Sequence, residues 1–325
     1  MPSTREQSIE RIRALLERAG FYVADTHSIR PTSFDLAARR DATLLLVKVL
    51  KNIDALDSEE ATRLRELGQL FPAVTLVIGQ TSGASDLDPG VVYTRYGVPI
   101  INEETLQEFL EKALPPFLYA SPGGTFAQID GPRLRELRSV RGLSLGTLAG
   151  IAGVSRRAIQ LYEEGAGAEA LVIERIESFL GEPIVRPINL FEWPERAKEE
   201  EADREAEEPP ERPLPRTGDA LRDGVLRQLD GMGIEVTVTL RAPFDALART
   251  PEVLLATAGS LRTALHRAEV LHGLARVAEG HALFVVRDPV PRPSIAGLPI
   301  LTITELRRHR DPDELIEEIT ERESP

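Results

Sequence analysis

A short serine–glycine pattern in the middle of the chain constrains the local fold more than any other feature. Ser144 precedes an apolar-periodic run over residues 145–152, and its hydroxyl can cap the first turn of a helix. Gly153 ends that run and can adopt the left-handed backbone conformation of a tight interhelical turn. Ser155 can cap a second run, which extends to Glu163. The pattern predicts two short helices joined by a turn.

Further helices are predicted on both sides of this pair. Pro132 suits a first helical position, and Leu134 and Leu137 give the apolar side of a helix that ends before Gly142. After Gly165, four apolar residues at helical spacing predict another helix that closes the core: Leu171, Ile173, Ile176 and Leu180. Residues 128–190 are therefore predicted to form an all-α domain.

This arrangement resembles the helix-turn-helix of the lambda repressor/Cro-like, or XRE, family over about fifty residues. The resemblance is carried by the spacing of Leu134-Arg135-Glu136-Leu137-Arg138, Gly142-Leu143-Ser144, Leu148-Ala149, Gly153-Val154-Ser155, Ile159 and Tyr162-Glu163. In that family the third helix enters the major groove of DNA, and its first side chains touch base edges. The resemblance implies a recognition helix at residues 155–163.

Six residues match DNA-contacting positions of that family: Ser155, Arg156, Arg157, Ala158, Gln160 and Leu161. Arg156 and Arg157 fall at base-reading positions, where arginine can bond guanine O6 and N7. Ser155 is expected to contact phosphate, Ala158 a thymine methyl group, and Gln160 either kind of group. Leu161 stands where a polar reader is common, so it reads apolar groups or none.

The net charge of −13 would repel DNA if it were evenly spread, but it is not. Residues 192–212 carry ten acids and four bases, or −6, whereas residues 131–163 carry six arginines and two glutamates, or +4. The six arginines are Arg133, Arg135, Arg138, Arg141, Arg156 and Arg157. Ordinary surface charge is the alternative interpretation, and it is stronger for the first four. The acidic, proline-rich stretch 191–216 is predicted to be an exposed linker, or a solvated helix over residues 195–207.

Two α/β segments flank the helical domain, and the second repeats the plan of the first. Residues 1–120 are predicted to hold helices near residues 9–19, 58–70 and 104–113 and strands near 21–24, 34–38, 44–50, 73–78 and 98–101. The repeat is carried by four matches between residues 217–325 and the first segment. In the first helix and strand, Ile12, Leu16, Gly20 and Val23 correspond to Val225, Leu229, Gly233 and Val236. Further along, Phe34-Asp35 corresponds to Phe244-Asp245, Thr43-Leu44-Leu45 to Val253-Leu254-Leu255, and Gly97-Val98-Pro99-Ile100 to Gly297-Leu298-Pro299-Ile300. The predicted fold class is thus α+β multidomain, a helix-turn-helix domain between two duplicated small α/β domains.

Asp35 on one strand and Lys48 on the next resemble the PD-(D/E)xK nuclease fold, in which acids hold Mg²⁺ and a lysine assists the attacking water. Glu10 could supply a helix acid, but Leu46 stands where the motif needs Asp or Glu. In the second copy Asp245 persists, with Ala256 and Ala258 read as replacing the acid and the lysine. The pattern disfavours an active nuclease and leaves a degenerate nuclease fold and an unrelated α/β sensor open.

Other chemistry finds little support. The absence of cysteine excludes disulfides, thiolate catalysis and Cys-ligated metals, and the five histidines lack ligand spacing. The loop 79–83 lacks the lysine of a phosphate loop, and Gly123-Gly124 is interpreted as an interdomain turn. No targeting or membrane-spanning segment is evident, so a cytoplasmic protein without cofactor, metal or membrane contact is expected.

The order of segments as a whole resembles archaeal HTH-type transcriptional regulatory proteins of this length. The resemblance implies a sequence-specific transcription regulator that binds double-stranded DNA and is not an enzyme. Because such readers commonly bind near-palindromic sites, we expect a homodimer, with the α/β copies as its interface. A nuclease and a protein-interaction module are the alternatives, and the sequence identifies no small-molecule effector.

Overall fold

The computed structural model describes residues 4–26, 28–29, 32–192, 217–239, 241–249, 252–290 and 292–323. The chain divides into two compact units, one of residues 1–49, 58–75 and 194–325 and the other of residues 50–57 and 76–193. Two β-sheets and the helices around them give a mixed α/β fold. From residue 193 to 216, the predicted linker and the alternative helix at 195–207 lie outside the described residues.

The first unit begins with an α/β segment. Its elements are α1 (Arg5–Arg18), β1 (Tyr22–Asp25), β2 (Leu36–Arg40), β3 (Thr43–Asn52) and α2 (Ser58–Leu70). Thr4 and Gln7 form a capping box that starts α1, which buries Ile12 and Leu16 completely. The strands β1, β2 and β3 pair antiparallel in sequence order, so this half of the sheet is a meander under an amphipathic helix.

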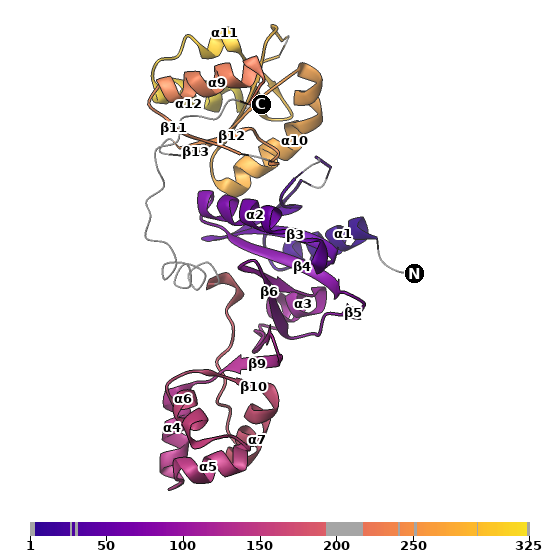
Figure 1. Ribbon diagram of the computed structural model, residues 1–325. Coiled ribbons are helices and arrows are strands. Elements are labelled where there is room, and N and C mark those ends of the chain that lie inside the picture. The colour runs from indigo at the N-terminus through magenta and orange to yellow at the C-terminus, as the bar shows by residue number, and fades with distance from the viewer. Residues whose placement is uncertain are drawn as a thin grey trace. The chain divides into compact units, whose positions relative to one another are not determined.

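The C-terminal α/β segment lies in the same unit. Its elements are α9 (Ala220–Gly231), β11 (Glu235–Val238), β12 (Ala246–Arg249), β13 (Val253–Ala258), α10 (Leu261–Ala278), β14 (His281–Val286), β15 (Ser294–Ile295), β16 (Leu298–Thr302), α11 (Ile303–Leu306) and α12 (Pro312–Glu323) (Figure 1). The strand order is β11-β12-β13-β14-β16-β15, with β13, β14 and β16 parallel. Leu229 of α9 and Leu315 and Ile319 of α12 share one buried cluster with Leu283 and Val285 of β14.

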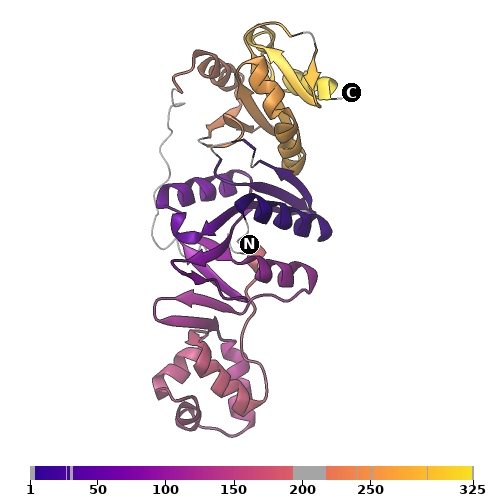
Figure 2. The ribbon, with the colours of Figure 1, turned by 90° about the vertical axis from the view of Figure 1, so that its right-hand side faces the viewer.

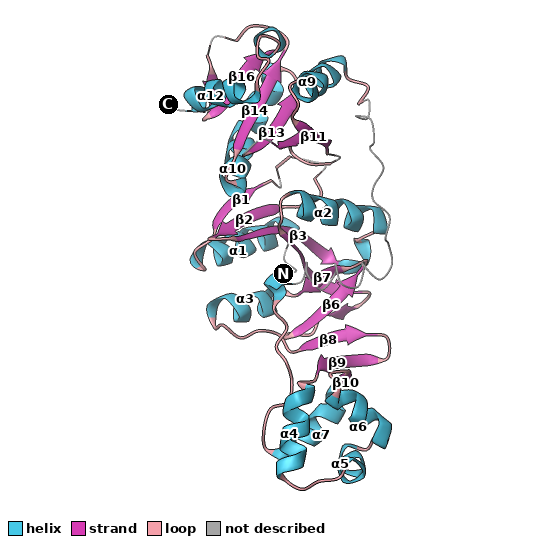
Figure 3. Ribbon diagram, turned by 90° about the vertical axis from the view of Figure 1, so that its left-hand side faces the viewer, coloured by secondary structure: helices cyan, strands magenta, loops and turns pink. Residues whose placement is uncertain are grey.

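Helix α10 packs against β1, so the two α/β segments contact each other within the first unit (Figure 3). The guanidinium of Arg276 lies 4.4 Å from the ring centre of Tyr22, and Arg39 Nε donates to the carbonyl oxygen of Val277 at 2.6 Å. Phe71 and Phe244 meet edge to face, with ring centres 5.7 Å apart. Aromatic, cation–π and backbone contacts therefore join segments that are far apart in the sequence.

The second unit contains further strands and a group of helices. Its elements are η1 (Ile53–Ala55), β4 (Val74–Ser82, with its first residues in the other unit), β5 (Ser85–Asp86), β6 (Val91–Arg95), β7 (Val98–Ile101), α3 (Glu103–Glu111), β8 (Leu118–Ser121), β9 (Gly124–Gln128), α4 (Gly131–Val140), α5 (Leu145–Ala152), α6 (Arg156–Glu163), β10 (Gly167–Glu169), α7 (Ala170–Leu180) and η2 (Leu190–Glu192). The sheet order is β1-β2-β3-β4-β7-β6-β8-β9-β10, and β5 pairs with β4. Figure 2 shows α4 to α7 gathered around one another next to the β9 and β10 strands.

Several local predictions fail in this unit. Residues 128–190 are not all helical, because β10 pairs antiparallel with β9. Pro122 and Gly123 form the turn of the β8–β9 hairpin and Gly124 begins β9, so Gly123-Gly124 is not an interdomain turn, and residues 79–82 belong to β4 rather than to a loop. In α7, Leu171 is 57% exposed, and Val172 is buried in its place. The β9–β10 pairing and the orientation of α7 depend on partners remote in sequence, which local patterns do not reveal.

The two α/β segments have the same strand order through six strands, since β1-β2-β3-β4-β7-β6 corresponds to β11-β12-β13-β14-β16-β15. The predicted register between them is wrong by one residue in the third strand. The amide of Asp35 donates to the carbonyl oxygen of Val47, and that of Asp245 donates to the carbonyl oxygen of Ala256. The connection into β13 is one residue shorter, because Arg39 pairs with Leu44 whereas Arg249 pairs with Val253. The counterparts of Leu46 and Lys48 are therefore Leu255 and Thr257, not Ala256 and Ala258.

Candidate nucleic-acid interface

The turn between α5 and α6 depends on Gly153. Its backbone is left-handed, with φ +73° and ψ +29°, and the following amide, of Val154, donates to the carbonyl oxygen of Ala149 at 3.0 Å. A Cβ at this position would lie 2.7 Å from Nη1 of Arg175. The same Nη1 donates to the carbonyl oxygen of Ala152 at 3.2 Å, which satisfies the end of α5. The left-handed backbone therefore favours glycine at this position, and an added Cβ would also displace the Arg175 guanidinium.

Helix α6 is fixed by a cap at its start and by one anchor in the core. Ser155 Oγ accepts from the Ala158 amide at 3.1 Å, as the sequence predicts. Ile159 is completely buried in a cluster that includes Leu134, Leu148 and Ile176 from three other helices. Because Ile159 faces inward, the side chains on the opposite side of α6 must point away from the core.

The six predicted contact residues lie together on the first two turns of α6. Ser155, Arg156, Arg157, Gln160 and Leu161 are exposed, and Ala158 is half-buried. Within the described part of the chain, Arg156 and Arg157 make no hydrogen bond or ion pair. The side-chain amide of Gln160 donates to the carboxylate of Glu164 at 3.3 Å, which is a long and exposed hydrogen bond. Arg156 and Arg157 are therefore exposed to solvent, and neither has an intramolecular partner in the described chain.

The four other arginines of this region are engaged within the fold. Arg138 and Arg135 both pair with the buried carboxylate of Glu163, and the hydrogen bond to Glu163 raises the pKa of Arg138. The two remaining arginines bind elsewhere: Arg133 pairs with Glu136 and Glu182, and Arg141 donates to the carbonyl oxygens of Phe179 and Leu180. The sequence did not reveal these pairs, because most of the partners lie more than 20 positions away.

The nuclease-like position in the first α/β segment is occupied by an ion pair. Asp35 is completely buried, and both of its oxygens accept from Nη2 of Arg5, at 2.6 and 2.7 Å. The amide of Val49 donates to Oδ2 of Asp35 at 2.8 Å. Arg5 Nε also donates to the carbonyl oxygen of Val49. A guanidinium thus neutralises the carboxylate that the nuclease motif would use as a metal ligand.

Lys48 is also held by neighbours that the motif does not supply. Its ammonium lies 2.6 Å from Oε1 of Glu60 and 3.0 Å from the carbonyl oxygen of Thr32. Leu46 is buried, and Glu10 is an exposed residue that pairs with Arg13. Among the residues that the structure places, no three His, Cys, Asp or Glu side chains form a group that could hold a metal. These residues do not fit the Mg²⁺ site of a nuclease.

Asp245 occupies the position of Asp35 in the second segment, and each of the two directly precedes a strand rather than lying on it, β2 for Asp35 and β12 for Asp245. Its Oδ2 accepts from the Ala258 amide at 2.8 Å and lies 3.3 Å from Nε of Arg222. Burial raises the pKa of Asp245, against the opposing effect of the Ala258 amide and of Arg222. Asp35 therefore joins β3 to Arg5 of α1, and Asp245 joins β13 to Arg222 of α9.

Comparison with known proteins gives one family match in the first α/β segment. Residues 5–115 match the model of a PD-(D/E)XK superfamily domain. No solved structure matches the chain. Along the part of the chain that the structure places, no helix has the length and apolar content that a membrane span would need.

Full-length relatives are known under one name, "Putative HTH-type transcriptional regulatory protein". The relative from Methanocella arvoryzae is 38% identical over 322 residues, 98% of this chain and 97% of its own length. Those from Natronomonas pharaonis and Halorubrum lacusprofundi are 37% and 36% identical, each over 98% of this chain and over 99% and 98% of their own lengths. At this identity and coverage, the chain belongs to the family of these HTH-type transcriptional regulatory proteins.

Proposed function

We propose that the protein is a sequence-specific transcription regulator that reads double-stranded DNA with α6. One observation carries the proposal. Of the six arginines between residues 131 and 163, Arg156 and Arg157 alone are without an intramolecular partner in the described chain, and they stand at the exposed start of a capped helix. An arginine that is free in the unbound protein can form bidentate bonds to guanine without first breaking an ion pair.

We assign the helix-turn-helix to α5 and α6 of a Cro-like, XRE-type domain. The assignment is supported by the left-handed Gly153, by the Ser144 and Ser155 caps, and by the common core of α4 to α7. The β9–β10 pair is an addition to the helical core, on the side of α7. Arg156, Arg157, Gln160 and Leu161 of α6 remain exposed beside it. In this assignment, α6 can therefore enter the major groove of DNA directly.

We further propose that neither α/β segment is catalytic and that the protein acts as a homodimer. The Arg5–Asp35 and Lys48–Glu60 pairs favour a structural role for the residues that resemble a nuclease motif. The shared strand order of the two segments supports an origin by duplication, which stays a prediction. Sedimentation of the intact protein tests the dimer, and a monomer at high concentration would contradict it.

Selection of bound sequences from a random duplex library tests the main proposal. The full-length protein should enrich one motif, and its affinity should fall as salt rises, because phosphate contacts release counterions. Failure to enrich any sequence, with retention independent of salt, would favour a protein-interaction module instead. Nicking of the duplex that requires Mg²⁺ and Asp35 would favour the nuclease. The symmetry of the enriched motif would also report the stoichiometry.

A further inference from the structure

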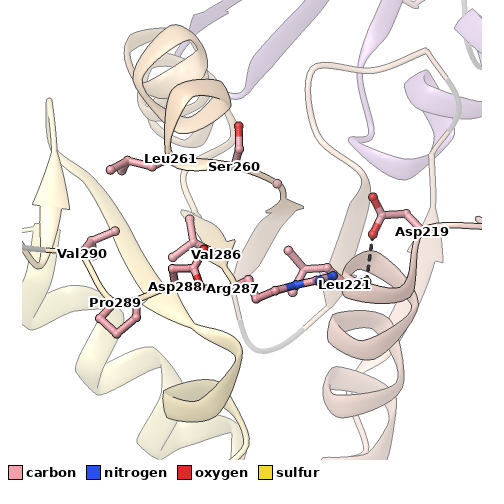
Figure 4. Close-up of a pocket in the computed structure, with 10 residues that line it drawn as sticks. Asp219, Leu221, Ser260, Leu261, Val286, Arg287, Asp288, Pro289 and Val290 are labelled. Carbon is pink, nitrogen blue, oxygen red and sulfur yellow. Dashed lines mark hydrogen bonds between the residues drawn. The ribbon is translucent and has the colours of Figure 1, made fainter.

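A cavity of about 480 Å³ lies in the C-terminal α/β segment, where β13 and β14 end (Figure 4). Residues 259–261 directly follow β13, residues 287–290 directly follow β14, and Asp219 and Leu221 lie at the start of α9. The two strands are adjacent and parallel. Open α/β sheets bind ligands at the carboxyl ends of such strands, in cavities of roughly 300–1,000 Å³.

The first α/β segment closes the equivalent place with its own side chains. The register of the strands makes Lys51 the counterpart of Ser260 and Thr81 the counterpart of Asp288. Thr81 Oγ1 donates to the carbonyl oxygen of Lys51 at 3.2 Å, which joins the two strand ends directly. In the same place, Ile53 packs against Gly79 of β4. The cavity of the second segment lies at the position that these contacts fill in the first segment.

The lining of the cavity combines an apolar wall with one free pair of opposite charges. Arg287 and Asp288 are exposed, and in the described chain neither makes a hydrogen bond or ion pair. Asp219 is already committed, because its Oδ1 accepts from the amides of Leu221 and Arg222 at 2.8 and 3.3 Å. In Figure 4 Leu261, Pro289 and Val290 gather on the side of the cavity away from Asp219.

We propose that this cavity binds a small α-amino acid with an aliphatic side chain. The carboxylate of the ligand pairs with Arg287, its ammonium group pairs with Asp288, and its side chain contacts Leu261, Pro289 and Val290. A zwitterion matches the two free charges, whereas a phosphate dianion would face two lining carboxylates and one cation. The proposal concerns the C-terminal segment alone and does not depend on DNA binding by α6.

Calorimetric titration of the full-length protein with leucine, isoleucine, valine and alanine tests the proposal. At least one of the first three should bind, and at least tenfold more tightly than alanine. For leucine, the matched analogues are 4-methylpentanoate, which lacks the ammonium group, and 3-methylbutylamine, which lacks the carboxylate. Each should bind at least tenfold more weakly than leucine. The absence of binding by all four amino acids, or equal binding of either analogue, would overturn the proposal.

Variants locate the site. Arg287→Ala should weaken binding of the amino acid at least tenfold, whereas Arg310→Ala removes an exposed arginine outside the cavity and should leave the affinity unchanged. Leu261→Trp fills the cavity from a position that is 37% exposed, so it should abolish binding without disturbing the core. Amide resonances of residues 259–261 should shift on titration. Unchanged affinity in both cavity variants would place any binding elsewhere and refute the assignment.

Discussion

Arg138 of α4 holds the buried carboxylate of Glu163, the last residue of α6, through two hydrogen bonds, one of them from Nη2 to Oε2 at 3.0 Å. The Glu163 side chain is 4% exposed, so the pair lies largely out of water. Arg138 also donates to the carbonyl oxygen of Leu143, ahead of α5. One ion pair thus fixes the end of the proposed recognition helix to the rest of its domain.

Glu163→Gln should destabilise the helical domain by about 3 kcal/mol, because it leaves the partly buried Arg138 without its counter-charge. Chemical denaturation of the full-length protein, followed by a probe in α4 to α7, measures the loss. Glu136→Gln is the matched control, since Glu136 is an exposed partner of Arg133. A change below about 0.5 kcal/mol in Glu163→Gln would show that the pair contributes little.

Arg156→Ala and Arg157→Ala should each relax sequence preference at one base position, at a cost of about 1–3 kcal/mol on the best site. Repeating the duplex selection with each variant gives the changed position directly. Arg133→Ala removes an arginine that is paired to glutamates and should leave the motif intact. Equal weakening on every sequence would instead make Arg156 and Arg157 phosphate contacts.

Gly153→Ala should destabilise the helical domain by about 1–2 kcal/mol, because a side chain is strained at positive φ and would press on Arg175. Gly150→Ala is a matched control three residues earlier in α5, where an added Cβ meets nothing within 4 Å. That change should raise stability by about 0.5–1 kcal/mol. Thermal unfolding of both variants decides the point, and equal effects would contradict the role given to Gly153.

The pH dependence of stability should reveal His281, which lies between Glu323 at 3.0 Å and Glu252 at 2.7 Å. The hydrogen bond with Glu323 raises the pKa of His281. A raised pKa in the folded state means that the stabilisation is fully present below the ordinary imidazole pKa of about 6.5 and is lost as pH rises through the folded value. His281→Asn should therefore lower the free energy of unfolding at pH 5.5 more than at pH 9. An equal loss at both pH values would count against this coupling.

Asp35→Asn should lower stability by about 3 kcal/mol, because Arg5 loses its buried carboxylate partner. Because we propose that the α/β segment is not catalytic, Asp35→Asn and the unmodified protein should nick duplex DNA in Mg²⁺ to the same background level. Glu10→Gln serves as the control for an exposed acid of the same segment. Nicking that is present in the unmodified protein and lost in Asp35→Asn would establish a nuclease.

Local signals made α5, α6 and the turn between them predictable. Ser144, Gly153 and Ser155 act through hydrogen bonds and backbone angles within a few residues, and α5 has the predicted bounds Leu145–Ala152. The partners of Arg138 and Asp35 were not predictable, because Glu163 and Arg5 lie 25 and 30 positions away. The one-residue error at Ala256 has the same origin, since pairing across a turn sets register and periodicity alone does not.

The contact between α10 and β1 has a consequence for proteolysis. The C-terminal segment is joined to the rest of the protein covalently through residues 193–216. It is also held to the first α/β segment by the Arg276–Tyr22, Arg39–Val277 and Phe71–Phe244 contacts. A protein nicked between Glu192 and Thr217 should accordingly elute as a single species under native conditions and separate into two fragments only in denaturant.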